Sequence, residues 1–363
     1  MEKAKEVVNP HAPSREEAEK CEEMNLITYK AQKTLSSLPP FPQQKRKEYD
    51  PLYKDLPVLG PFKYKNGNTY LGQYKEGKRT GFGNLVRPDG CFYEGYWEDD
   101  TFEKYGRKVM KDGSYYEGES SQGKPNGFGT RVLSKGTKYQ GEWKDGEMSG
   151  LGMLTYFGGE KYVGEFKNHK KHGWGFSEIQ NGSKYIGEFQ AGKKQGWGFC
   201  RWSSGSNYTG QFENGNQHGW GYSESASGEK YLGDWKRGHN DGWAFSRGLD
   251  GREYIGEMKE GKIDGFGYTR GPKGDRYLGE FNLGRREGWG QIRYSDGKKY
   301  FGEWKNDCAE GRGHIEKFRG MVYTGEMKNS AVHGRGRLKF PNGYQYVGEF
   351  KHGKRHGFGT CTL

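Results

Sequence analysis

The chain has 363 residues, of which 63 are glycine and only 31% are apolar, with a net charge of +12. This composition argues against a large globular core, and no run approaches the roughly 18 apolar residues of a membrane span. The five cysteines are scattered and form no CxxC pair, which indicates free thiols in a reducing compartment. They are Cys21, Cys91, Cys200, Cys308 and Cys361. We expect a soluble, cytoplasmic protein.

Residues 1–62 are interpreted as an N-terminal extension. Ser14 and Glu17 have the spacing of a capping box, so the sequence predicts a helix over about residues 15–36. Pro39, Pro40 and Pro42 end this helix, and residues 43–49 are interpreted as part of a polar, Pro-rich linker. Two roles of the helix stay open: a cap on the rest of the chain, or a docking element for a partner.

Residues 63–363 are periodic. The motif Tyr-x-Gly recurs every 23 residues in thirteen copies, whose tyrosines are Tyr70, Tyr93, Tyr116, Tyr139, Tyr162, Tyr185, Tyr208, Tyr231, Tyr254, Tyr277, Tyr300, Tyr323 and Tyr346. Such a constant spacing indicates a repeat array in which each unit contacts only its neighbours. We number the repeats one to thirteen and count positions from each of these anchor tyrosines as 0.

Each repeat predicts two strands. Glycine at +2 and an aromatic residue at +4 share a face with the anchor tyrosine, because alternate residues of a strand point the same way. A Gly-aromatic-Gly motif at +11 to +13 starts the second strand, after a Gly-rich turn. Residues that we interpret as structural anchors are Tyr70, Gly72, Tyr139, Gly141, Trp143, Tyr162, Gly164, Phe166, Trp174, Tyr185, Trp197, Tyr231, Trp235, Tyr300, Trp304 and Tyr346.

The predicted fold is all-β. We expect an elongated, single-layer antiparallel meander of β-hairpins, held by a stacked ladder of two or three aromatic rings per repeat. Positions +3 and +5, often Glu and Lys, are expected on a solvated face. Departures from the pattern include Lys104 at +11, Ala244 at +13, and Arg312 and Arg335 at +12. These positions are interpreted either as partner contacts or bends, or as neutral drift.

Residues 162–175 carry the most specific pattern. They read Tyr-Val-Gly-Glu-Phe-Lys-Asn-His-Lys-Lys-His-Gly-Trp-Gly, which resembles the MORN repeat (membrane occupation and recognition nexus). The resemblance implies a β-hairpin solenoid that serves as a scaffold, as in radial spoke head proteins of cilia, apicomplexan cytoskeletal proteins and junctophilins. Some MORN segments are instead attached to enzymes such as plant phosphatidylinositol-phosphate kinases.

Catalytic, metal and cofactor sites are not expected. No glycine motif opens a helix in the manner of a phosphate loop. The histidines at +10 lie a repeat or more apart, too far to share one ion. Carboxylates such as Glu142 and Glu165 recur with the repeat, so none stands out as a catalytic acid.

A basic rim is the best candidate surface. Its residues at +8 and +9 are Lys170, Lys171, Lys193, Lys194, Arg285 and Arg286. They are interpreted either as a solvated turn or as a site for acidic proteins or anionic phospholipids. Nucleic acid is not expected, because the ladder uses the aromatic rings that would stack on bases.

Function is therefore expected to lie in assembly. We expect a non-catalytic scaffold of the cytoskeleton that binds other proteins of a large complex, in a ciliary axoneme by family resemblance. The alternative is a peripheral adaptor on anionic membranes. The last strand is expected to leave an open edge for a partner or for a second copy in a homodimer.

Overall fold

The computed structural model describes residues 29–317 and 319–363. It divides into two compact units, the first ending at Lys193 and the second starting at Lys194. Each is described by itself. Within the described ranges, no helix is both long and apolar enough to cross a lipid bilayer.

The described part of the first unit, from residue 29 onward, contains two short helices, one 3₁₀ turn and twelve strands. Their bounds are α2 (Tyr29–Ser37), α3 (Gln43–Tyr49), η1 (Asp50–Leu52), β1 (Val58–Lys63), β2 (Thr69–Lys75), β3 (Lys78–Val86), β4 (Phe92–Glu98), β5 (Thr101–Val109), β6 (Tyr115–Ser121), β7 (Lys124–Val132), β8 (Lys138–Lys144), β9 (Glu147–Thr155), β10 (Lys161–Lys167), β11 (Lys170–Glu178) and β12 (Lys184–Gln190).

The second unit consists of strands only, as far as the chain is described. They are β13 (Lys193–Arg201), β14 (Asn207–Glu213), β15 (Asn216–Glu224), β16 (Lys230–Lys236), β17 (His239–Arg247), β18 (Glu253–Lys259), β19 (Lys262–Arg270), β20 (Arg276–Asn282), β21 (Arg285–Arg293), β22 (Lys299–Lys305), β23 (Cys308–Glu316), β24 (Val322–Lys328), β25 (Ala331–Lys339), β26 (Gln345–Lys351) and β27 (Lys354–Thr362).

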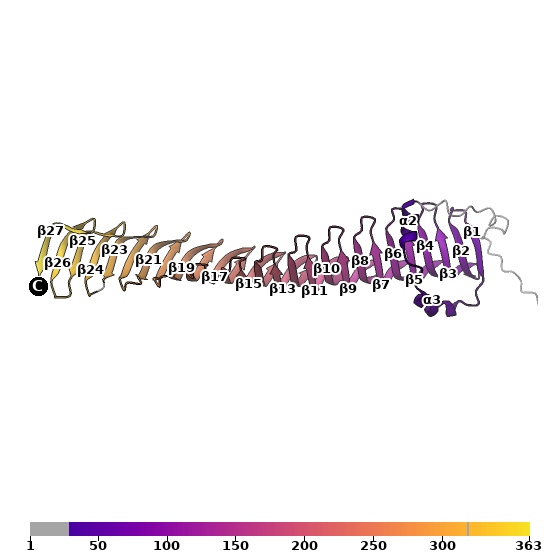
Figure 1. Ribbon diagram of the computed structural model, residues 1–363, viewed down its shortest axis with the longest axis horizontal. Coiled ribbons are helices and arrows are strands. Elements are labelled where there is room, and N and C mark those ends of the chain that lie inside the picture. Colours follow the sequence, from indigo (N-terminus) through magenta and orange to yellow (C-terminus); the bar gives the residue numbers. More distant parts are fainter. Residues whose placement is uncertain (1–28, 318) are drawn as a thin grey trace, which may run out of the picture. The chain divides into compact units, whose positions relative to one another are not determined.

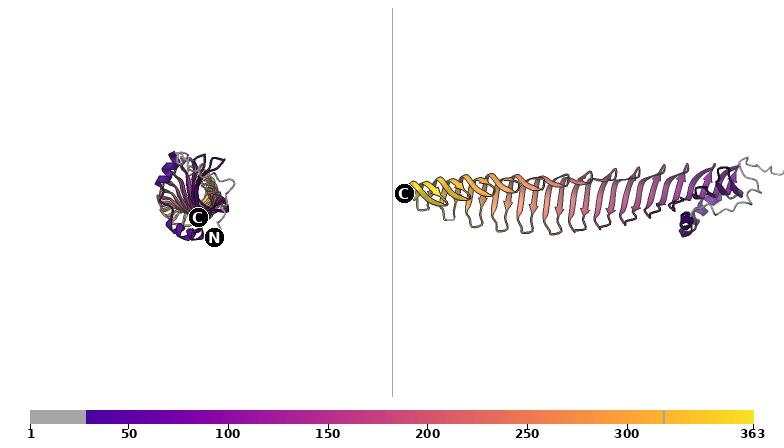
Figure 2. Two further views of the ribbon diagram at one scale, coloured as in Figure 1. Left: turned by 90° about the vertical axis from the view of Figure 1, so that its right-hand side faces the viewer. Right: turned by 90° about the horizontal axis from the view of Figure 1, so that it is seen from above.

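In both units the chain forms an antiparallel meander, which confirms the predicted fold class. Every strand pairs with the next one along the chain within its unit, as β10 does with β11 and β14 with β15. Figure 1 shows consecutive strands side by side in each unit, and Figure 2 shows their turns along the margins. One strand, β1, precedes the first repeat and pairs with β2.

Glycine at +13 makes room for the anchor tyrosine. In repeat five, Gly164 lies opposite Gly175, and the buried ring of Tyr162 covers this pair. A Cβ atom on Gly175 would lie only 2.5 Å from the Tyr162 hydroxyl oxygen. That hydroxyl donates a hydrogen bond of 2.9 Å to the carbonyl oxygen of Glu165. The Tyr-x-Gly spacing therefore reflects a tyrosine ring that packs over two facing glycines, where any Cβ atom would collide with it.

The rings at 0 and +4 form the predicted ladder. Tyr139 meets Trp143 of its own repeat at 5.1 Å between centroids, and Phe166 of the next repeat at 5.0 Å. Both contacts are edge-to-face, at 89° and 83°. Each such pair adds about 0.5–1.5 kcal/mol beyond its buried area. The core is thus a series of aromatic contacts between neighbouring repeats, interrupted where Ser120, Met258 and Met327 occupy +4.

The expected third ring is not part of this ladder. Trp174 and Trp197, which the sequence analysis counts as structural anchors, are 57% and 49% exposed. Since Gly175 at +13 faces the anchor tyrosine, its neighbour Trp174 at +12 must point to the opposite face of the sheet. The ring at +12 is therefore outside the ladder, and the expectation that it contributes a third ring was wrong.

The N-terminal extension contains one helix that was not expected. Residues 43–49, interpreted from the sequence as linker, form helix α3. Of the helix expected over residues 15–36, the structure describes only the last part, α2; Ser14, Glu17 and Cys21 lie outside the described residues. In α2, Ala31 is buried against Val109 of β5, and Thr34 donates a hydrogen bond of 2.9 Å to the carbonyl oxygen of Gly113. The described part of the extension therefore packs on the array.

Alkaline pH is expected to unfold the array. Burial raises the pKa of Tyr162 and of Tyr323 to about 12, above the value near 10 of an unfolded tyrosine. Stability from these neutral phenols is therefore complete below about pH 10 and is lost as pH rises toward 12. We expect tyrosinate absorbance and loss of strand circular dichroism to rise together above pH 10. Ionisation that is complete while the dichroism is unchanged would contradict this.

Candidate functional site

The six residues of the basic rim divide into two groups. Lys170, Lys193 and Arg285, at +8, are exposed at the starts of β11, β13 and β21. The residues at +9 instead lie over aromatic rings of the ladder. The distances to the ring centroids are 5.0 Å from Lys171 Nζ to Tyr162, 5.6 Å from Lys194 Nζ to Phe212 and 4.1 Å from Arg286 Cζ to Trp304. The alternation of a strand thus turns every second rim cation toward the ladder.

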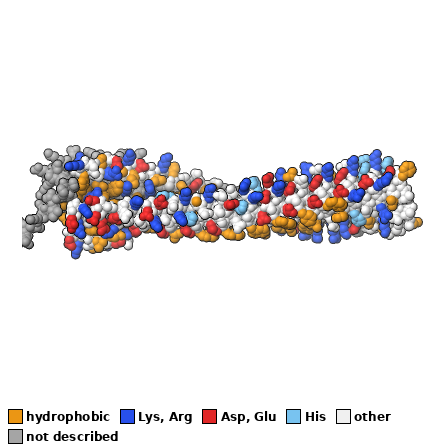
Figure 3. Space-filling model, turned by 180° about the vertical axis from the view of Figure 1, so that it is seen from behind, with side chains coloured by type: hydrophobic (Ala, Val, Ile, Leu, Met, Phe, Trp, Pro, Cys, Tyr) orange, Lys and Arg blue, Asp and Glu red, His pale blue; other side chains and the backbone are white. Residues whose placement is uncertain are grey.

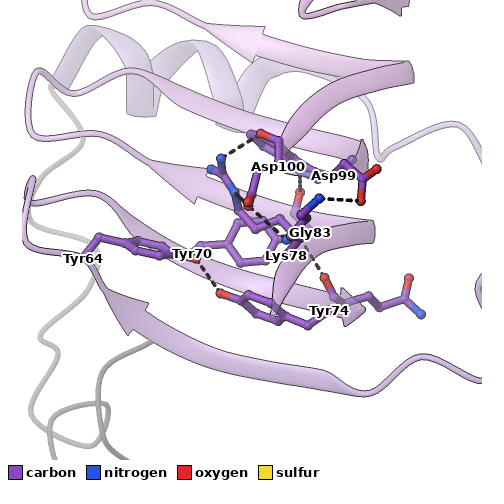
Figure 4. Close-up of polar contacts among 10 residues, drawn as sticks. Tyr64, Tyr70, Tyr74, Lys78, Gly83, Asp99 and Asp100 are labelled. Carbon is purple, nitrogen blue, oxygen red and sulfur yellow. Dashed lines mark hydrogen bonds and ion pairs between the residues drawn. The ribbon is translucent and has the colours of Figure 1, made fainter. Parts of the chain in front are cut away.

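Arg286 is also bound to an acidic residue. Its Nε donates to Asp307 Oδ1 at 3.0 Å and its Nη2 to the Asp307 carbonyl oxygen at 2.9 Å. Repeats one and two show the same arrangement, in which Arg79 Nε donates to Asp100 Oδ1 at 2.9 Å. Beside it, Lys78 Nζ lies 3.6 Å from Asp99 Oδ1 (Figure 4). The rim is therefore partly neutralised from within the chain.

These carboxylates also explain a departure from the repeat pattern. Asp100, Asp307 and Ser330 occupy position +7, where most repeats have glycine, and their φ angles are 67°, 67° and 64°. Each side chain accepts a hydrogen bond from the backbone N–H of the +9 residue one repeat earlier: Asp100 from Arg79, Asp307 from Arg286 and Ser330 from Ala309. Such short polar side chains tolerate the left-handed region, so the substitutions are local capping and require no partner.

The carboxylates at +3 have a structural role that the sequence analysis missed. Glu165 accepts a hydrogen bond of 3.0 Å from the backbone N–H of Trp174. The same bond, nine residues apart, joins Glu142 to Leu151, Gln211 to Trp220, Asp234 to Trp243, Glu280 to Trp289, Glu303 to Arg312 and Glu326 to Arg335. The sequence contained a pattern that could have revealed this role: every repeat except the second combines a Glu, Asp or Gln at +3 with glycine at +11.

Repeat two is the exception that supports this pairing. Its +3 residue is Tyr96, which has no carboxylate, and its +11 residue is Lys104 with φ of 62°. Where glycine does occupy +11, as at Gly173, a Cβ atom would lie 2.3 Å from the Glu165 carboxyl carbon. The +3 acceptor and the +11 glycine are therefore replaced together.

Half-exposed rings form a row on the face opposite the ladder. In the second unit this aromatic row consists of the +12 residues Trp197, Trp220, Trp243, Phe266 and Trp289. Apolar residues at +1 lie on the same face and are also exposed: Leu232, Ile255, Leu278 and Phe301. The space-filling view shows hydrophobic side chains in a string of patches along one margin of this unit (Figure 3).

In the first two repeats the corresponding face is covered by the chain itself. Phe41 packs edge-to-face on the +12 rings Phe82 and Tyr105, at centroid distances of 5.0 and 5.7 Å. The guanidinium carbon of Arg46 lies 3.9 Å above the centre of the Phe82 ring. As a result Tyr96 at +3 is 0% exposed, and its hydroxyl donates to Asp50 Oδ1 at 2.6 Å.

A family model for the MORN repeat matches eleven segments of the chain. They are residues 70–92, 116–138, 139–161, 162–184, 185–207, 208–229, 254–276, 277–299, 300–316, 323–343 and 346–363, which together cover more than half of the sequence. The chain belongs to the MORN repeat family. The match omits residues 93–115 and 230–253, which contain the departures at Lys104 and Ala244.

Solved structures resemble this MORN protein only weakly. The TCP domain of SAS-4 from Drosophila melanogaster, in complex with a proline-rich motif of Ana2, has a TM-score of 0.29 at 10% identity, over 43% of this chain and 85% of that one. The TCP10 domain of Danio rerio CPAP, in complex with a peptide of STIL, has a TM-score of 0.22 at 14% identity, over 65% and 95%. No curated protein sequence matches significantly. Such low scores carry no argument about function.

Titratable residues of this MORN protein form no metal site in the part that the structure describes, where no three His, Cys, Asp or Glu side chains come together. Cys91, Cys200, Cys308 and Cys361 are free thiols. What the repeats present instead is extended surface: exposed rim cations at one margin and the aromatic row on the face opposite the ladder.

Proposed function

We propose that this MORN protein is a non-catalytic structural scaffold of the cytoskeleton, within a ciliary axoneme complex such as the radial spoke. The observation that carries the proposal is the meander itself, in which side chains of each kind recur at a constant interval and offer one surface to several partners. A repeat-based interaction scaffold is what the MORN family match supports. The cytoskeletal and axonemal setting rests on family resemblance.

Partner proteins are proposed to use two further elements. All residues of β27 are exposed, so another protein or a second copy could pair with it by strand addition. The N-terminal extension is the other element, through the part that precedes α2. Free cysteines fit a cytoplasmic location, where thiols stay reduced.

A peripheral membrane adaptor is the second candidate. The observation in its favour is the exposure of Lys170, Lys193 and Arg285 at +8, each on a turn where a phospholipid headgroup has access. Lys171, Lys194 and Arg286 pack over rings, so only three of the six rim cations extend toward a headgroup. We therefore rank it below the scaffold.

Fractionation separates the two functions. A tagged full-length chain expressed in ciliated cells is expected to stay with the axoneme after detergent extraction, because proteins hold it there. The purified chain is expected to pellet poorly with phosphatidylserine vesicles at 150 mM salt. Release by detergent, together with vesicle binding that is lost in K170E/K193E/R285E, would overturn the scaffold in favour of the adaptor.

A further inference from the structure

We infer that the aromatic row of the second unit (Trp197, Trp220, Trp243, Phe266 and Trp289) is a binding face for a basic, helical segment of a partner protein. This inference goes beyond the scaffold proposal because it assigns the surface and the chemistry of the ligand. It does not depend on where in the cell the protein works.

Exposed rings of this kind are unusual in a surface that serves only stability. Each of the five is about half exposed, and apolar +1 residues lie between them on the same face. Contiguous exposed apolar surface in soluble proteins typically marks an interaction site. The ladder on the other face holds the repeats together, so these rings are available for binding.

Acidic side chains lie beside the rings and favour a positively charged group of the ligand at each ring. Each +12 ring lies directly across from the +3 residue of the next repeat: Trp220 from Asp234, Trp243 from Glu257, Phe266 from Glu280 and Trp289 from Glu303. The bond to a backbone N–H occupies only part of a carboxylate, which offers about four acceptor sites. A cation over the ring can therefore also meet a carboxylate, a contact that a phosphate at the same point could not make.

Contacts of the same chemistry occur within the chain itself. In the first unit, Arg46 of α3 stacks on the +12 ring Phe82 at 3.9 Å. One residue earlier, Lys45 Nζ lies 5.3 Å from the centre of the +12 ring Tyr105 and 3.9 Å from Oε1 of the +3 residue Glu119. The +12 rings of the first two repeats are thus covered by a basic helix, α3, together with the nearby aromatic residue Phe41.

Geometry sets the length and period of the partner. Equivalent rings in successive repeats are two strands apart, about 10 Å. A helix rises about 1.5 Å per residue, so a helix lying along the row presents residues i and i+7 to successive rings. Spanning the four rings from Trp220 to Trp289 needs about 20 residues, with one arginine or lysine on the contacting side in each heptad.

The natural sequence supplies a substitution that the fold accepts. Arg312 and Arg335 occupy +12 in repeats eleven and twelve, on strands with the same bulged pairing. Trp220→Arg and Trp243→Arg therefore place a residue that this position already tolerates, while replacing two cation-binding rings by like charge. Leu249→Arg is the matched control, because Leu249 is an exposed turn residue of the same unit.

The probe is a synthetic, fluorescein-labelled 21-residue helix with one phenylalanine and one arginine per heptad on the same side. We expect it to bind the purified full-length chain with micromolar affinity, measured by anisotropy, and to shift tryptophan emission to the blue. W220R/W243R should weaken binding at least tenfold, E257Q/E280Q should weaken it less, and L249R should leave it unchanged. Circular dichroism and the urea midpoint of W220R/W243R verify that it folds.

Three results would overturn the inference: no binding of the arginine peptide, equal binding of a peptide with glutamate in place of arginine, or equal binding by W220R/W243R. Sedimentation supplies a further one. If the free chain is a dimer that W220R/W243R converts to monomer, the row is a contact between copies. Because all components are purified, failure here leaves the fractionation result, and with it the scaffold proposal, unaffected.

Discussion

Tyr208→Ala should cost about 3–5 kcal/mol of stability, the range for removing a large aromatic side chain from a core. Tyr208 is 0% exposed and contacts Phe212 and Trp235, each at 5.1 Å between centroids. Its hydroxyl donates a 2.8 Å hydrogen bond to the carbonyl oxygen of Gln211. Alanine would remove both ring contacts and leave two facing glycines uncovered, so the ladder would be interrupted.

The measurement is a urea titration followed by circular dichroism, with hydrogen exchange to locate the loss, because repeat arrays need not unfold in one step. Tyr208→Phe removes only the hydrogen bond and should cost about 1 kcal/mol. Trp220→Ala, in the same repeat but on the opposite face, should also cost about 1 kcal/mol or less. Equal losses for Y208A and W220A would show that the ladder does not hold the sheet together.

Arg107→Ala should cost about 3 kcal/mol and loosen the N-terminal extension. The Arg107 side chain is 4% exposed and lies between Glu94, at 3.3 Å, and Glu117, at 3.1 Å. Its Nη2 also donates to the carbonyl oxygen of Pro39 at 3.0 Å. Removing one member of a buried ion cluster leaves uncompensated charge, which typically costs about 3–5 kcal/mol. We take the lower end because both carboxylates retain some contact with water.

Acid should relieve the R107A defect. Burial raises the pKa of Glu94, and Arg107 acts against this rise. Without the cation the pKa of Glu94 should rise further, so the folded state binds a proton more readily than the unfolded one. The defect is therefore expected to be larger at pH 7 than at pH 5 in urea titrations. E94Q/R107L/E117Q, which removes all three charges, should recover much of the loss; if it is no more stable than R107A, charge burial is not the cause.

Much of this fold follows from spacing along the chain. The 23-residue period, the glycine between two aromatic positions and the alternation of strands predicted the hairpin meander and a ladder of rings from positions 0 and +4. These are local properties, because each repeat is a hairpin whose contacts reach only to its neighbours. The same locality made the family resemblance specific.

The missing step was the pairing of one strand with the next. The sequence analysis counted Trp174 and Trp197 among the structural anchors, because the residue pattern alone does not show which face of the sheet a +12 ring occupies. Once Gly164 is known to face Gly175, alternation sends Trp174 to the other side. The roles of Glu165 and Asp100 were missed for a related reason: their acceptors meet backbone N–H groups brought close only by a bulge or by the neighbouring repeat.

The sequence by itself determined the period, the strand content and the aromatic ladder, because those depend on contacts within a repeat and between adjacent ones. Only the tertiary structure decided which rings stay in water, since that depends on strand register. It also decided that α3, interpreted from the sequence as linker, covers Phe82 and Tyr105 through Arg46 and Lys45. Contacts between residues about 35 to 60 positions apart leave no periodic trace in the chain.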